Sequence, residues 1–244
     1  MRLTFLYRIL RWTAWLALLA GLVALAWLLL RPKPQDLPWT PLHLDAPVGL
    51  FAGRKLAGLT GDRSRCLALL HRTGLEITAV PPFGSGQCRV EDGVRLARGQ
   101  AMLTLAPARV APACPVVAAL AVWHWQVVQP AAQRLLGASV ARIEHLGSHS
   151  CRRLYGRAAG AWSEHATADA IDIAAFVLTD GRRISVLEDW RGGAPDEAAF
   201  LHIVRDGACR LFATVLSPDY NAQHRDHLHL DQAERGEMGW RACR

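Results

Sequence analysis

Hydrophobic and polar positions divide the chain into an apolar N-terminal run and a long region of mixed pattern. Residues 12–30 read WTAWLALLAGLVALAWLLL and contain no charged side chain. A helix of this length spans about 28 Å, which is enough to cross the hydrocarbon core of a bilayer. The run therefore predicts a transmembrane helix.

The mixed region predicts short helices and antiparallel hairpins. Asp62 is placed to cap a helix that ends before Gly74, and Pro115 suits the first turn of a helix that runs to about residue 136. Pro130 is expected to kink or split that second helix, because proline has no N–H to donate. Thr179-Asp180-Gly181 separates two apolar runs and predicts a hairpin turn.

The remaining elements follow from shorter apolar runs. A further helix is expected at 195–205, and strands are expected at 75–80, 89–94, 102–105, 170–178, 183–187, 209–216 and 227–231. Helices and hairpins mix without a βαβ rhythm, so the predicted class is α+β. We expect an N-terminal transmembrane helix followed by one domain with a small antiparallel sheet flanked by helices.

Composition at the segment boundaries predicts four parts. These are a cytoplasmic basic segment (1–11), the transmembrane anchor (12–30), a proline-rich tether (31–47) and a globular domain (48–244). The tether holds five prolines in 17 residues, which predicts a stiff, extended chain.

The excess of basic residues is concentrated at the N-terminus. The net charge is +7, but residues 1–33 hold five basic and no acidic side chains, so the remainder carries a net of +2. That balance argues against a nucleic-acid partner. The basic N-terminus favours a single-pass protein of the inner (cytoplasmic) membrane, with its C-terminal domain in the periplasm or outside the cell. A cleaved signal peptide is the alternative, but Trp27-Leu-Leu-Leu30 runs into Arg31 without a small-x-small cleavage site.

Six cysteines follow the anchor, and none has C-x-x-C spacing. An even, widely spaced set beyond a membrane anchor predicts up to three disulfides in an oxidising compartment. Spacing does not select among the 15 pairings that six cysteines permit. The candidates are Cys66, Cys88, Cys114, Cys151, Cys209 and Cys243.

Two stretches carry residues suited to metal chemistry. In His224-Arg-Asp-His-Leu-His-Leu-Asp231, the side chains of His227, His229 and Asp231 leave one face of a strand. In Ser163-Glu-His-Ala-Thr-Ala-Asp-Ala-Ile-Asp172, a carboxylate sits within an apolar run, where it needs a partner or a cation. His165 and Asp172 can meet an imidazole of the second stretch at a shared zinc. Two histidines and one carboxylate leave a coordination position open, as in catalytic zinc sites.

Other candidates have simpler interpretations. Ser163 lacks a G-x-S-x-G elbow, so a serine hydrolase is not favoured. The remaining histidines are interpreted as surface residues or satisfied core residues; they are His43, His71, His124, His145, His149 and His202.

These motifs resemble known families. S-x-H-x6-D followed far downstream by H-x-H resembles the zinc-peptidase superfamily that joins lysostaphin-type enzymes, D-alanyl-D-alanine carboxypeptidases and hedgehog amino-terminal domains. A closer resemblance, over residues 66–243, is to the bacterial extensin-like C-terminal domain family. It rests on Cys151-Arg152, Ser163-Glu-His-Ala, Ala170-Ile-Asp172, Thr214-Val-Leu, Pro218-Asp-Tyr-Asn221 and His224-Arg-Asp-His-Leu-His-Leu-Asp231.

The resemblance implies a site and a function. It implies zinc ligands at His165, Asp172 and His229, with His227 beside the metal-bound water. The triplet His224, His227 and His229 is also similar to that of penicillin-insensitive murein endopeptidases. Arg152 matches an arginine that helps hold substrate or the oxyanion, and strand alternation makes Asp231 a partner that orients an imidazole.

The expected function is hydrolysis of amide bonds in the peptidoglycan peptide by a membrane-anchored, Zn²⁺-dependent enzyme. The alternatives are a non-catalytic, zinc-stabilised envelope-binding module and a structural envelope protein with a vestigial site. One departure from the superfamily pattern S-x-H-x-x-G-x-A-x-D is Ala168 in the place of Gly. If that position needs a positive φ, alanine costs about 1 kcal/mol there.

Overall fold

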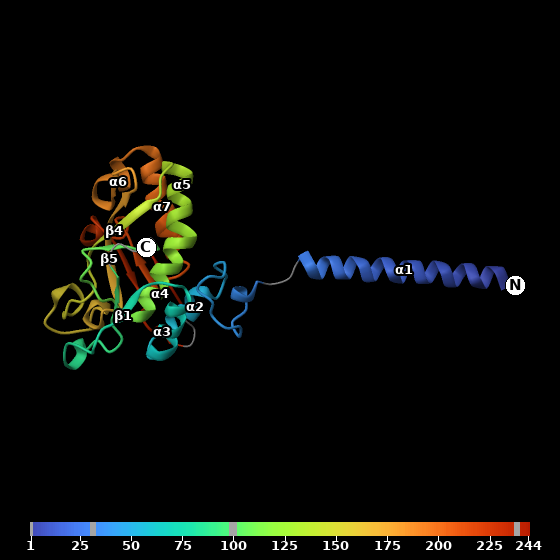
Figure 1. The fold of residues 1–244 in the computed structure, drawn as a ribbon, viewed down its shortest axis with the longest axis horizontal. Helices are drawn as coiled ribbons and strands as arrows, with labels where there is room; N and C mark the ends of the chain where they lie inside the picture. Colours follow the sequence, from blue (N-terminus) through green and yellow to red (C-terminus); the bar gives the residue numbers. More distant parts are fainter. Residues whose placement is uncertain (1, 30–32, 98–101, 237–239) are drawn as a thin grey trace.

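A computed structural model describes residues 2–29, 33–97, 102–236 and 240–244. Figure 1 shows the N-terminal helix standing apart from a domain of helices and strands. The helices are α1 (Arg2–Leu29), α2 (Ala52–Ala57), α3 (Arg63–Arg72), α4 (Cys114–Trp123), α5 (Gln129–Leu136), α6 (Val186–Gly192) and α7 (Pro195–Ala208). The strands are β1 (Ile77–Ala79), β2 (Val94–Leu96), β3 (Leu105–Ala106), β4 (Val140–Gly147), β5 (Ala170–Leu178), β6 (Arg183–Ser185), β7 (Thr214–Leu216), β8 (Leu228–Asp231) and β9 (Ala242–Cys243). The class is α+β, as predicted.

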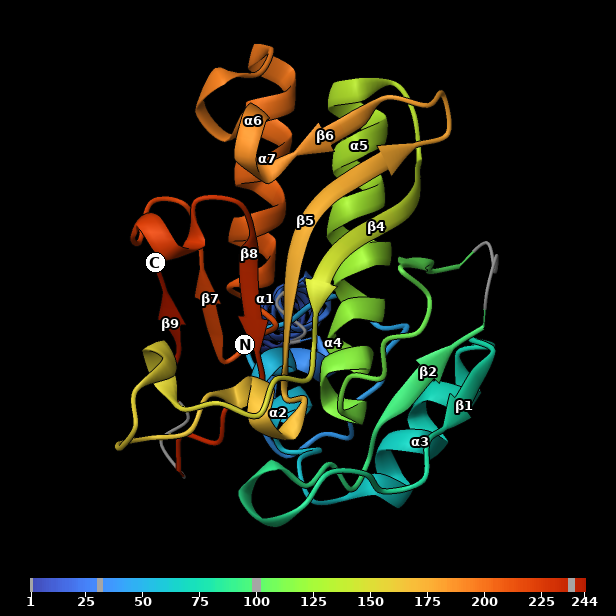
Figure 2. The same cartoon turned by 90° about the vertical axis from the view of Figure 1, so that its left-hand side faces the viewer.

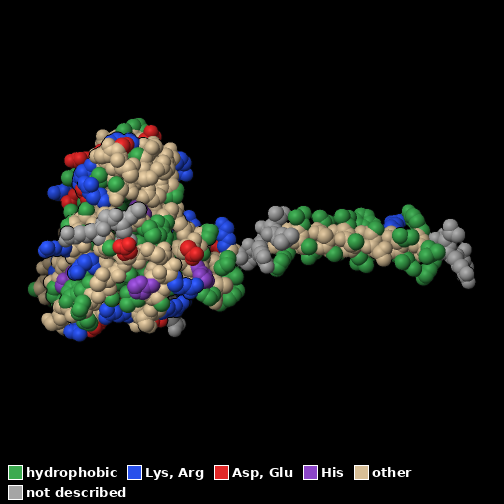
Figure 3. Space-filling view, viewed as in Figure 1, with side chains coloured by type: hydrophobic (Ala, Val, Ile, Leu, Met, Phe, Trp, Pro, Cys, Tyr) green, Lys and Arg blue, Asp and Glu red, His purple; other side chains and the backbone are tan. Residues whose placement is uncertain are grey.

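Helix α1 contains one candidate membrane span, Phe5–Trp27, with a mean hydropathy of 1.8 and none of its surface buried. Figure 3 shows its apolar side chains lying on all visible sides of the helix. A helix that is apolar all round is suited to lipid rather than to water. The predicted span of 12–30 agrees with this helix up to Leu29; Leu30 and Arg31 lie outside the described residues.

Seven strands form the main sheet. Their order is β3-β4-β5-β8-β7-β9, and β6 pairs with the free part of β5. Figure 2 shows the long strands β4 and β5 crossing the centre of the domain. The pairings of β4 with β5, β5 with β8, β8 with β7 and β5 with β6 are antiparallel. The predicted hairpin around Thr179-Asp180-Gly181 is the β5–β6 turn, while β3 and β9 pair in parallel at the two edges.

The core lies between this sheet and the helices behind it. Every residue of α4 is buried, because its sequence is apolar on all faces and gives it no solvent side. Pro115 lies in its first turn, as predicted. A π-helical segment, His124–Val128, separates α4 from α5 just before Pro130. The expected interruption at this proline is therefore a π segment between two helices.

The proline-rich segment differs from the expected extended tether. From Lys33 onward it folds against the domain, with a 3₁₀ turn at Pro34–Asp36 and with Leu42 and Leu44 inside the hydrophobic core. These leucines bury apolar surface that an extended chain would leave in water. Residues 31 and 32 lie outside the described residues.

Six of the seven predicted strands are shorter or shifted. The runs 75–80 and 227–231 lose one or two residues at their ends, and the run 183–187 ends at Ser185, because this residue caps helix α6, which begins at Val186. The other three depart further. The run 89–94 gives two isolated bridges, from Val90 to Phe83 and from Gly93 to Ala113, before β2 begins at Val94, because a bend at 91–92 interrupts it. The run 102–105 becomes β3 only at its end. In the run 209–216, α7 extends to Ala208 and a turn follows, so that pairing starts at Thr214.

All six cysteines are paired, as their even number predicted. The pairs are Cys66–Cys114, Cys88–Cys151 and Cys209–Cys243. The first joins α3 to the start of α4, and the third joins the end of α7 to β9. The second fastens the loop after β4 to the loop before β2, beside the site described next.

Candidate metal centre

Strands β5 and β8 bring the two predicted stretches together. Asp172 and His229 are direct cross-strand partners, so their side chains leave the same face of the sheet. Ile171 and Leu230, the neighbouring pair, are fully buried on the opposite face. The alternation that packs the core therefore also fixes Asp172 and His229 on the outer face.

His165 reaches the same point from a short 3₁₀ turn, Glu164–Thr167. The Ser163 hydroxyl accepts a hydrogen bond from the His165 backbone N–H, as in N-terminal caps. Ser163 is thus a capping residue in this fold. The turn ends at Ala168, which has φ +60° and ψ +16° and leads the chain into β5.

Three side chains converge closely. One ligand atom from each of His165, Asp172 and His229 lies within 4.8 Å of the others. His165 Nε2 is 3.2 Å from Asp172 Oδ1 and 3.1 Å from His229 Nδ1, and the last two atoms are 2.9 Å apart. The structure thus assembles the three residues whose spacing predicted a shared site.

The outer nitrogen of each imidazole has its own partner. His165 Nδ1 is 2.9 Å from the Ser148 carbonyl oxygen, which can only accept, so this nitrogen carries the proton. His229 Nε2 lies 3.1 Å from the Asp231 carboxylate and donates to it. Nε2 of His165 and Nδ1 of His229 are therefore the atoms directed at the shared point. Asp231 has the orienting position expected from strand alternation.

The electrostatics of the cluster favour a cation at its centre. Burial alone would raise the pKa of Asp172, but its hydrogen bonds with His165 and His229 outweigh that effect and hold the pKa below its usual range. Burial also opposes the charged form of His229, yet the carboxylates of Asp172 and Asp231 raise its pKa to about 9. A proton on His229 thus occupies, in the metal-free chain, the place a metal cation would take.

His227 and His224 line the open side of the cluster. His227 Nε2 is 3.6 Å from Asp172 Oδ1, and its Nδ1 lies 2.9 Å from the Asp226 carboxylate. The His224 ring lies 5.2 Å from that of His227, centroid to centroid. Its Nδ1 is 2.8 Å from Asn221 Oδ1 and donates to it. Burial, reinforced by the charges of His227 and His229, lowers the pKa of His224 to about 4.

A groove of about 700 Å³ opens over these histidines. Its volume lies within the range of small-molecule sites, about 300–1,000 Å³. Arg152 is exposed and lines the groove. No contact described for the Arg152 side chain joins it to the histidines, so the structure places it in the same groove and not within the cluster.

Sequence reasoning missed four residues of the site, and only two of them lay in a motif that could have indicated them. Ser148, whose carbonyl fixes the tautomer of His165, is recognisable only once β4 and the 3₁₀ turn are packed together. Tyr155 lines the groove from a loop and has φ +59°. Tyr220 and Asn221 lie within the Pro218-Asp-Tyr-Asn221 motif, which was the available signal for both.

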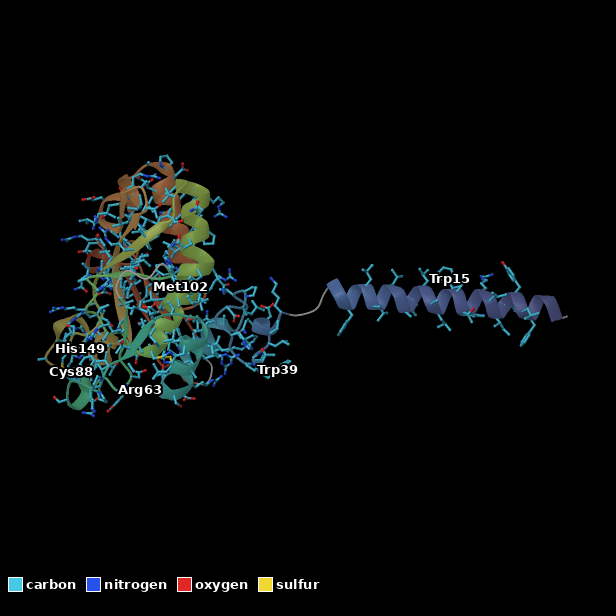
Figure 4. The ribbon with its side chains drawn as sticks, viewed as in Figure 1. Trp15, Trp39, Arg63, Cys88, Met102 and His149 are labelled. Atoms are coloured by element: carbon cyan, nitrogen blue, oxygen red, sulfur yellow. A yellow bond between two sulfur atoms is a disulfide. The ribbon has the colours of Figure 1, made fainter. Side chains whose placement is uncertain are left out.

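The other histidines do not join the cluster. His124 and His145 are buried, and burial lowers the pKa of each. His202 packs on the ring of Trp190, and His149 Nε2 is 3.3 Å from the Cys88 carbonyl. Figure 4 shows His149 and Cys88 close together on the domain.

Comparison with known proteins gives one match. A sequence model described as "Extensin-like protein C-terminus" matches residues 64–244, which is most of the chain. No curated protein and no solved structure matches the chain.

Proposed function

Because the chain belongs to the extensin-like C-terminal family, we propose that it is a membrane-anchored, zinc-dependent hydrolase of amide bonds in the peptide part of peptidoglycan. The observation that carries the proposal is the convergence of His165, Asp172 and His229 in a groove that also holds His227. The geometry supports a metal site, and the resemblance of the motifs to murein peptidases supports the substrate class.

The donor set fits zinc. Tetrahedral ligands about 2.0–2.1 Å from zinc lie about 3.3–3.4 Å from one another. The separations of 2.9–3.2 Å in the cluster are within a few tenths of an ångström of this value. The outer N–H groups of the two imidazoles are hydrogen-bonded to the Ser148 carbonyl and the Asp231 carboxylate, so the other ring nitrogens are free to bind zinc. With the Asp172 carboxylate they make three ligands, which leaves a fourth position for a small ligand. When bound there, zinc supplies Lewis acidity that polarises a carbonyl and lowers the pKa of water.

His227 is the proposed general base. Its Nε2 faces the cluster, while the Asp226 carboxylate 2.9 Å from Nδ1 fixes the orientation of the ring. A general base of this kind takes a proton in the hydrolytic step and returns it to the leaving amine. His224, whose low pKa keeps it neutral, stands beside it as a hydrogen-bonding group.

Arg152 is proposed to bind negative charge. Its side chain is exposed along the groove, so it can reach the oxyanion that develops on the scissile carbonyl or a carboxylate of the substrate. Helix α1 is proposed to hold the domain at the inner membrane on the periplasmic side, where disulfides form.

The test uses the full-length chain in detergent, loaded with zinc and incubated with purified peptidoglycan sacculi. Wild type and a His202→Ala control are expected to release new muropeptides, resolved by chromatography. His227→Ala is expected to keep its zinc but to lower kcat by about 10²–10⁴-fold.

One outcome would reverse the proposal. If the zinc-loaded wild type releases nothing, yet binds sacculi as tightly as His227→Ala does, the hydrolase proposal is wrong. The protein is then a zinc-stabilised binding module of the cell envelope.

A further inference from the structure

Tyr155 has an unusual backbone for its residue type. Among the described residues, only Tyr155 and Ala168 combine a side chain with a positive φ. This left-handed conformation is strained for a residue with a Cβ. Tyr155 is also 50% exposed, so burial of its ring does not offset the strain. Strained residues of this kind concentrate at functional sites.

Contacts within the loop at residues 153–162 hold Tyr155 at the groove. The loop is closed at its base by a bridge between Arg153 and Trp162, and the Arg153 guanidinium stacks 4.3 Å over the Trp162 ring. A hydrogen bond from Leu154 N to Ala161 O adds a second closure. Arg157 lies 5.4 Å over the Tyr155 ring. The strained conformation is thus imposed by a loop with its own internal contacts.

Tyr220 lines the same groove. Its phenol interacts with that of Tyr155 and raises the pKa of Tyr155. The Tyr220 ring is 42% exposed and packs 5.6 Å from the ring of His224. His224 in turn contacts His227 and His229. The two phenols therefore stand at the outer end of a continuous row of rings that leads to the metal ligands.

We propose that Tyr155 and Tyr220 form a subsite for a sugar ring, so that the groove takes peptides linked to a glycan strand in preference to free peptides. The preference for glycan-linked peptides as substrates rests on the proposed function. The binding of a sugar ring by the two tyrosines does not. A pyranose ring has an apolar C–H face and hydroxyl groups at its edge. Arg157 covers part of the Tyr155 ring and His224 covers part of the Tyr220 ring, but about half of each residue stays exposed, and this aromatic surface with phenol hydroxyls at its edge matches both parts.

The chemistry of the rim argues against an apolar peptide side chain as the occupant. Such a side chain gains most from an enclosed pocket that removes it from water. Tyr155, Tyr220 and the adjacent Leu154 are each more than 40% exposed and form an open ledge. A flat ring stacked on an open aromatic surface keeps its polar edge in water and needs no enclosure.

The experiment measures binding of N-acetylglucosamine tetramer to the full chain in detergent by titration calorimetry. Tyr155→Gly removes the ring and relieves the positive φ, and a cooperative thermal unfolding transition checks that the variant is folded. Its affinity for the tetramer should fall about tenfold, the loss expected for one aromatic contact. Trp39→Ala is the control, because Trp39 is 78% exposed and lies on the opposite side of the domain from Cys88 (Figure 4). It should bind like wild type.

The outcomes separate the subsite from the reaction. Tetramer binding that depends on Tyr155 and persists in His227→Ala supports the subsite even if no bond is cut in sacculi. Equal tetramer affinity in wild type and Tyr155→Gly overturns it. A second result also overturns the sugar subsite: wild type does not bind the tetramer, and Tyr155→Gly loses affinity for a free D-alanyl-D-alanine peptide. The ledge is then a binding surface for the peptide.

Discussion

Ala168 offers a quantitative test of how the metal-binding turn is built. Its φ of +60° directs its carbonyl oxygen toward the backbone N–H of Ala113, the N-cap of α4, at 2.9 Å. The same oxygen accepts a hydrogen bond from the Ser148 hydroxyl at 3.2 Å. These bonds hold the turn in a conformation that glycine adopts freely and alanine does not. We therefore consider Ala168→Gly.

The expected change in free energy of unfolding has three contributions. Relief of the left-handed strain stabilises by roughly 1–2 kcal/mol. Glycine increases the entropy of the unfolded chain, which costs about 0.4–1 kcal/mol. Loss of one fully buried methyl group costs about 0.8 kcal/mol. The sum is close to zero, so Ala168→Gly is expected to lie within about 0.5 kcal/mol of wild type.

Ala170→Gly is the matched control. Ala170 is equally buried and lies two residues away in β5, but its φ is not positive, so glycine relieves no strain there. Only the entropy of the unfolded chain and the loss of the buried methyl group remain, so we expect the free energy of unfolding to fall by about 1.5 kcal/mol.

Urea unfolding of both variants, at one zinc concentration and in one detergent, measures the difference through the transition midpoint. If Ala168→Gly is destabilised as much as Ala170→Gly, the turn is not strained and the reasoning is wrong. Zinc content should be unchanged in Ala168→Gly, because the backbone bonds of the turn remain.

Four further outcomes are expected. Wild type should contain about one zinc per chain by metal analysis, and His229→Ala should lose it while His202→Ala keeps it; equal contents in the two variants would contradict the ligand assignment. Asp231→Ala should weaken zinc binding about 10–100-fold in a competition titration, because the Nε2–H of His229 loses its acceptor; an unchanged affinity would show that the carboxylate does not orient the ring. Burial, with the charges of nearby carboxylates, raises the pKa of Asp169 to about 8. The protonated form is therefore the favourable one in the fold, and stability should fall as the pH rises from about 4 to about 8. Asp169→Asn should remove that fall, so that it is more stable than wild type at pH 8.5 but not at pH 4; parallel pH profiles of the two proteins would refute this. Thiol titration of the denatured, unreduced protein should find no free thiol, and four or more would contradict the disulfide pairs.

Local patterns were sufficient for the elements on which the site depends. Pro115 and an uninterrupted apolar run predict α4, and Thr179-Asp180-Gly181 predicts the β5–β6 turn, because each signal lies within the element itself. The need of Asp172 for a partner was also predictable, since an isolated carboxylate in an apolar strand is costly. That this partner is His229 was implied by the family resemblance.

What the sequence could not predict depends on contacts between distant segments. The pairing of Cys88 with Cys151 and the role of the Ser148 carbonyl follow from how β4 packs beside the 3₁₀ turn. The burial of Leu42 and Leu44 was missed because prolines around them favour an extended chain, whereas the core gains from covering these side chains. Turn residues such as Tyr155 adopt their conformation under the constraint of a whole loop.

The Cys88–Cys151 link has a consequence for the redox dependence of the candidate metal centre. Cys151 is three residues from Ser148, and the link closes a loop of 63 residues, which stabilises the folded chain by about 4 kcal/mol in the chain-entropy estimate. That is a large part of the total stability of a domain of this size, about 5–15 kcal/mol. A chain with reduced cysteines lacks this contribution next to the carbonyl that orients His165. The stability of the candidate metal centre is therefore expected to depend on the redox state of Cys88 and Cys151.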